Sequence, residues 1–91
     1  MTTVLRTPVL DDVAAELDRA VRRWQQLPLD RAVAASACVH GLLAELAGES
    51  LPDLGPAVVM DQLRVVVYDA CAKGEVPALA GRLAALRLSW A

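Results

Sequence analysis

Few side chains in this sequence have the chemistry of a nucleophile or a metal ligand. His40 is the only histidine, and Cys38 and Cys71 are the only cysteines. Cys38 and His40 lie two positions apart, and side chains at that spacing do not face each other on a helix. A Cys–His pair would therefore need Cys71 to arrive from another element. The spacing also matches no zinc-ligand pattern, so we expect no catalytic site, no metal and no cofactor here.

Two pairs of acidic residues have helical spacing. Asp12 and Glu16 are one turn apart, and Asp61 and Asp69 are about two turns apart if each segment is helical. Paired carboxylates can transfer protons or hold a cation. Without a histidine or a further acidic residue in register, these pairs are better interpreted as solvated helix faces.

One basic cluster could contact nucleic acid. Arg19, Arg22 and Arg23 lie close together, but Glu16 and Asp18 lie among them, and an Asp18–Arg22 ion pair is expected at that spacing. The whole chain has 9 basic and 11 acidic residues, a net charge of −2, which does not favour a polyanionic partner. We therefore do not expect a nucleic-acid partner. A small DNA-binding regulator or accessory protein is the alternative to the main functional hypothesis, which is given below.

Ser50 lies in the short sequence Gly48-Glu49-Ser50-Leu51. These four residues resemble the attachment site of acyl carrier proteins, which are small helical domains. Glu49 stands where the carrier pattern has Asp, and Pro52 follows where the pattern continues into a helix. We assign no family from these four residues. The third hypothesis for the function is a carrier, or an enzyme whose site is assembled across helices.

The apolar periodicity predicts an all-α fold. Apolar residues recur at three- and four-residue spacing, and Pro and Gly separate the segments. Trp24 continues the stripe of the first segment and is predicted to be packed. Val65–Tyr68 has strand propensity, but a lone strand is hardly stable, so helix is predicted there too. We expect one domain, 1–91, a small antiparallel bundle of four helices at about 8–26, 31–47, 56–73 and 77–89.

The composition indicates where this domain is located and what kind of genome encodes it. Hydrophobic residues make up 56% of the chain, yet the longest stretch without Asp, Glu, Lys or Arg, Ala32 to Ala44, is shorter than the roughly 20 residues that span a bilayer. Two cysteines without a paired spacing predict a reducing, cytoplasmic location. The absence of Phe, Ile and Asn, with one Lys against eight Arg, indicates a GC-rich bacterial genome.

The apolar surplus points to a protein partner. The segment 31–47 is apolar or small on nearly every side, which is typical of a central helix or of an oligomer contact. On the segment 56–73, apolar residues stand on an otherwise polar face. The candidate interface residues are Val58, Val65, Tyr68, Ala37 and Gly41. The sequence therefore favours a non-catalytic helical interaction module that self-associates, as a homodimer, or docks another protein.

Overall fold

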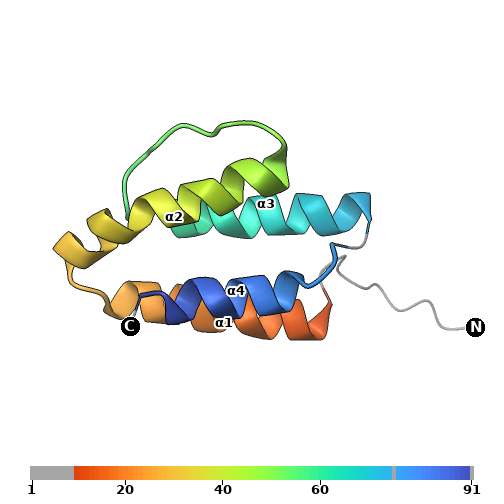
Figure 1. The fold of residues 1–91 in the computed structure, drawn as a ribbon, viewed down its shortest axis with the longest axis horizontal. Helices are drawn as coiled ribbons and strands as arrows, with labels where there is room; N and C mark the ends of the chain where they lie inside the picture. Colours follow the sequence, from red (N-terminus) through yellow and green to blue (C-terminus); the bar gives the residue numbers. More distant parts are fainter. Residues whose placement is uncertain (1–9, 75, 91) are drawn as a thin grey trace, which may run out of the picture.

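The computed structural model describes residues 10–74 and 76–90, and these residues form helices and no strand. The helices are α1 (Asp11–Gln26), α2 (Leu29–Ala47), α3 (Val59–Lys73) and α4 (Leu79–Leu88) (Figure 1). The all-α bundle of four helices is confirmed. The segment Val65–Tyr68 lies inside α3, so the helical prediction for it is correct.

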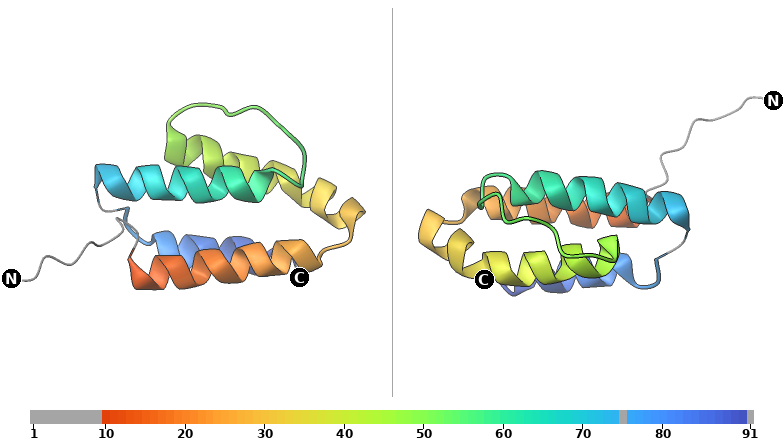
Figure 2. Two further views of the ribbon diagram at one scale, coloured as in Figure 1. Left: turned by 180° about the vertical axis from the view of Figure 1, so that it is seen from behind. Right: turned by 90° about the horizontal axis from the view of Figure 1, so that it is seen from above.

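The helices pack as two pairs, α1 with α4 and α2 with α3. Within each pair the two helices run in the same direction, while the two pairs run in opposite directions (Figures 1 and 2). The contacts agree, because Trp24 and Trp90 meet at the C-terminal ends of α1 and α4. The bundle is therefore antiparallel between the pairs and parallel within each pair.

The connection between α2 and α3 explains this arrangement. It runs from Gly48 to Val58 and returns along α2, as Figure 2 shows. With 19 residues, α2 is about 28 Å long at 1.5 Å per residue. The eleven connecting residues can span about 36 Å when extended, so they are long enough to start α3 beside the beginning of α2. Gly48, with φ 75°, ends α2 in the left-handed conformation that favours glycine.

The predicted apolar stripes form the core. Trp24 is 6% exposed, its ring packs edge-to-face on Trp90 with centroids 4.9 Å apart, and its indole N–H donates to the Pro56 carbonyl at 2.8 Å. The prediction that Trp24 is packed is confirmed. The other buried residues, all apolar, are Val13, Leu17, Ala20, Val21, Ala32, Val39, Leu42, Leu43, Val59, Met60, Leu63, Val66, Val67, Leu79, Leu83 and Trp90.

Two sequence predictions about the helices need correction. The prediction that α2 is a central helix is wrong within one chain, because Ala34, Ala37, Cys38 and Gly41 are exposed on it. α2 packs mainly on α3, and its Glu45 also pairs with Arg82 of α4. An oligomer contact through the exposed residues of α2 stays a prediction. α4 begins at Leu79 rather than at 77, because the preceding Ala78 has the left-handed backbone angles φ 58° and ψ 21°.

Candidate functional site

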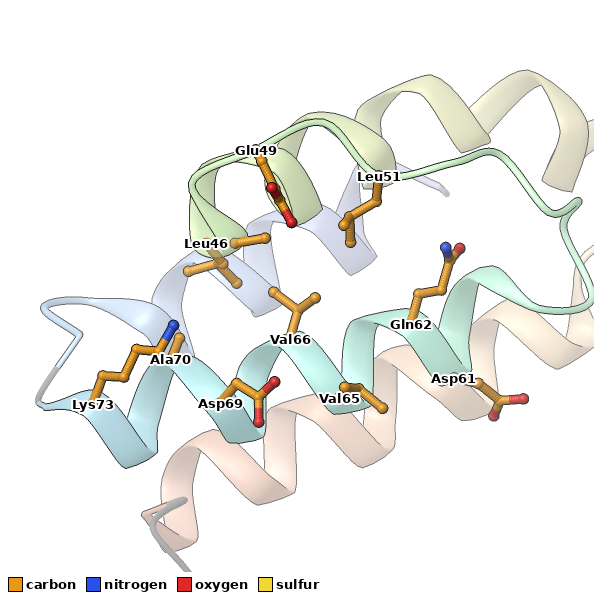
Figure 3. A pocket seen from close by; sticks show the side chains of 11 residues that line it. Leu46, Glu49, Leu51, Asp61, Gln62, Val65, Val66, Asp69, Ala70 and Lys73 are labelled. Atoms are coloured by element: carbon orange, nitrogen blue, oxygen red, sulfur yellow. The ribbon is translucent and has the colours of Figure 1, made fainter.

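One concave feature of the described residues is a groove between the C-terminal end of α2 and α3. It has a volume of about 440 Å³. Figure 3 shows Leu46 and Leu51 on one wall, facing Val66 and Ala70 on the other. Leu46 comes from the last turn of α2, and Leu51 comes from the connection that returns along that helix. The parallel course of α2 and α3 therefore creates the groove.

Four side chains at four-residue spacing follow α3 along the groove. They are Asp61, Val65, Asp69 and Lys73, and this spacing places them in one line on a helix. Glu49 adds a carboxylate from the opposite wall (Figure 3). The groove thus combines an apolar floor with a rim of three carboxylates and one ammonium group at its Lys73 end.

Gln62 closes one side of this groove. Its side chain extends from α3 toward the α2–α3 connection (Figure 3), and its Nε2 donates to the Pro52 carbonyl at 3.0 Å. The other end of the amide, Oε1, is buried and has no hydrogen-bond partner among the described residues. An acceptor without a donor is unfavourable when buried.

The five predicted interface residues do not form one patch. Val65 lines the groove and is 60% exposed, and Tyr68, one turn further along α3, is 50% exposed. Val58 is only partly exposed. Ala37 and Gly41 are exposed on α2 but do not line the groove. The structure therefore separates an α3 surface from an α2 surface.

The side chains with nucleophilic or metal-binding chemistry stand in different surroundings. Cys38 is exposed on α2 and Ser50 is exposed in the connection. His40 Nε2 lies 3.7 Å from Asp53 Oδ1. Cys71 is partly buried, and burial raises the pKa of its thiol, which lowers its thiolate fraction at neutral pH and makes it a weaker nucleophile.

Arg19 of the predicted basic cluster and the acidic residues beside it form ion pairs near the surface of the bundle. Arg19 pairs with Glu16 at 2.7 Å, and the expected Asp18–Arg22 ion pair is replaced by an Asp18–Arg64 pair at 3.5 Å. Among residues 10–74 and 76–90, no three His, Cys, Asp or Glu side chains gather as a metal site. In the same residues no helix has the length and hydrophobicity to cross a bilayer.

Comparison with protein-family models, with curated protein sequences and with solved structures found no match to this chain. The groove itself was missed by sequence reasoning. The line Asp61, Val65, Asp69 and Lys73 is visible as a four-residue repeat, but nothing in the sequence indicates that Leu51 returns to face it.

Proposed function

We propose that this protein is a non-catalytic helical interaction module that docks a helix of another protein in the groove between α2 and α3. The observation that carries the proposal is the exposed Val65 at the mouth of an apolar groove with a mainly acidic rim. Amphipathic helices commonly bind other proteins by placing one apolar face in such a groove. The free thiols of Cys38 and Cys71 support placing the module in a reducing compartment such as the cytoplasm.

Charge argues for another protein rather than a second copy in this groove. The rim has more carboxylates than ammonium groups, and the chain as a whole has a net charge of −2. A second copy would bring the same acidic rim to the contact, and like charges at an interface oppose association.

Photo-cross-linking in the protein's own cells tests the proposal. A benzophenone amino acid replaces Val65 in one variant and Val33, which is 57% exposed on α2, in the control. We expect an adduct of one discrete mass with another protein from position 65 and none of that mass from position 33. The adduct should disappear when Ala70→Trp fills the groove and persist with Ala72→Trp, a change at an exposed position of the same helix. Equal adducts from both positions, or adducts insensitive to Ala70→Trp, would contradict the proposal.

Self-association is the second candidate function, and a different surface favours it. The outward side of α2 carries Ala34, Ala37 and Gly41, all exposed, and α2 has no Asp, Glu, Lys or Arg between Arg31 and Glu45. An uncharged exposed helix face of this length is unusual on a monomer. Small side chains also allow a second helix to approach closely, and two-fold packing is the commonest oligomer symmetry.

Sedimentation at micromolar concentration separates the two candidates. A homodimer gives twice the monomer mass of 9.7 kDa. Ala37→Glu should dissociate a dimer that forms through α2, whereas Val65→Glu should do so if α3 forms the interface. Circular dichroism of each variant shows whether the monomer still folds. A clean monomer mass for the unmodified protein would rule out self-association.

A further inference from the structure

We infer that the helix bound in the groove is basic and amphipathic, and that it lies along α3 with its cationic side chains over Asp61 and Asp69. This inference rests on the proposed function and adds the chemistry of the partner. Two features of the groove carry it, namely its length with its apolar floor and the distribution of charge on its rim.

The dimensions of the groove fit a short helix. Its α3 wall extends from Asp61 to Lys73, which is about 18 Å at 1.5 Å per residue. A helix of about 12 residues covers that distance in roughly three turns. Its apolar residues, recurring at three- and four-residue spacing, would enter between Leu46 and Leu51 on one side and Val66 on the other.

The rim charges select the polar side chains of that helix. Asp61 and Asp69 are eight positions apart on α3, about 12 Å along the axis. Lys or Arg side chains separated by seven or eight positions on a bound helix, roughly two turns, would meet both carboxylates, and Glu49 would attract a further cation from the opposite wall. Lys73 lies at one end only, so it opposes a cation at that end and leaves the rest of the rim acidic.

Gln62 fixes the connection that forms part of the groove wall. Gln62 Oε1 is buried without a hydrogen-bond partner among the described residues, while Nε2 of the same amide is held by the Pro52 carbonyl. Because Nε2 is held by the connection, α3 and the connection are tied together at this end of the groove.

Three synthetic peptides of about 14 residues, a length that spans the groove, test the inference. The first carries Leu at positions i, i+4, i+7 and i+11 with Lys on the flanking positions. The second has Glu in place of each Lys, and the third has the composition of the first with the Leu positions scrambled. Affinities are measured by fluorescence anisotropy at low and moderate salt. We expect the first peptide to bind at least about ten-fold more tightly than the other two, and its affinity to fall with added salt because exposed charge pairs are screened.

Variants of the protein locate that binding. Asp61→Asn with Asp69→Asn removes the two rim charges and should weaken the basic peptide by roughly two-fold to thirty-fold, as expected for two exposed charge pairs. Asp11→Asn with Asp30→Asn makes the same change in net charge at exposed positions outside the groove and should leave binding unchanged.

The outcomes separate this inference from the proposed function. Equal binding of the basic and acidic peptides, or equal effects of the two double variants, would overturn the basic character of the partner. If position 65 still cross-links another protein in a groove-dependent way, the docking function would survive that result. Binding of the scrambled peptide as tightly as the first would show non-specific attraction of cations and would also overturn the inference.

Discussion

Replacement of Trp24 gives the sharpest test of how the two helix pairs are joined. Its indole contacts α4 through Trp90 and the start of the α3 segment through Pro56. Removing a buried aromatic ring costs about 3–5 kcal/mol. A domain of this size has a free energy of unfolding of about 5–14 kcal/mol, so Trp24→Ala should remove a large share of it and lower Tm by at least about 12 °C.

Trp24→Phe separates the hydrogen bond from the packing. The phenyl ring keeps most of the apolar contact with Trp90 but cannot donate to the Pro56 carbonyl, which loses a bond of 2.8 Å. We expect a loss of about 1–3 kcal/mol, the usual effect of removing one partner of a buried hydrogen bond.

Urea denaturation followed by far-ultraviolet circular dichroism measures both losses, because tryptophan fluorescence changes with the substitutions themselves. Trp90→Phe serves as a comparison that keeps the Trp24 hydrogen bond. A loss below about 1 kcal/mol for Trp24→Ala would refute the buried position of this ring, since that is the range of surface substitutions.

Further changes test local features. Ala78→Gly should stabilise the protein by about 0.5–1 kcal/mol in the same denaturation assay, because the left-handed backbone at this position is unfavourable for residues other than glycine. Loss of stability would contradict the assigned backbone angles. In iodoacetamide labelling followed by mass spectrometry, Cys71 should react more slowly than the exposed Cys38 at neutral pH, since burial raises the pKa of the Cys71 thiol. The unfolded chain ionises that thiol first, so stability should fall as the pH rises above the thiol's ordinary pKa; faster labelling of Cys71 would argue against its burial. Glu45→Gln should cost less than about 1 kcal/mol, because the Arg82–Glu45 ion pair is exposed to solvent, and a larger loss would mean that the pair is shielded.

The features that could be predicted from the sequence depend on neighbours in the chain. Helix spacing places Val13, Leu17 and Trp24 on one face, and these residues are buried in α1. Val65 and its neighbours have strand propensity, but the sequence offers no strands for them to pair with, so a helix is predicted. The structure confirms this prediction, because these residues lie inside α3.

The features that could not be predicted depend on the path of the chain through space. The connection from Gly48 to Val58 is long enough for either direction of α3, so the parallel order within the pairs has no local signal. The groove depends on that order, because Leu51 meets α3 only when the connection returns along α2. The choice of Arg64 rather than Arg22 as the partner of Asp18 likewise follows from packing.

The pairing of the first helix with the last has a consequence for how this chain folds during synthesis. The apolar stripe of α1 is covered by α4, which is made after the other three helices of the bundle. Contacts such as that of Arg31 with the Trp90 carbonyl join residues 59 positions apart. Neither packed pair is a local hairpin, because each needs a crossover before its helices can meet. We therefore expect slower folding than for an up-and-down bundle of equal length. The stripe of α1 therefore stays partly uncovered until α4 has left the ribosome, and during that interval we expect it to be open to chaperone binding.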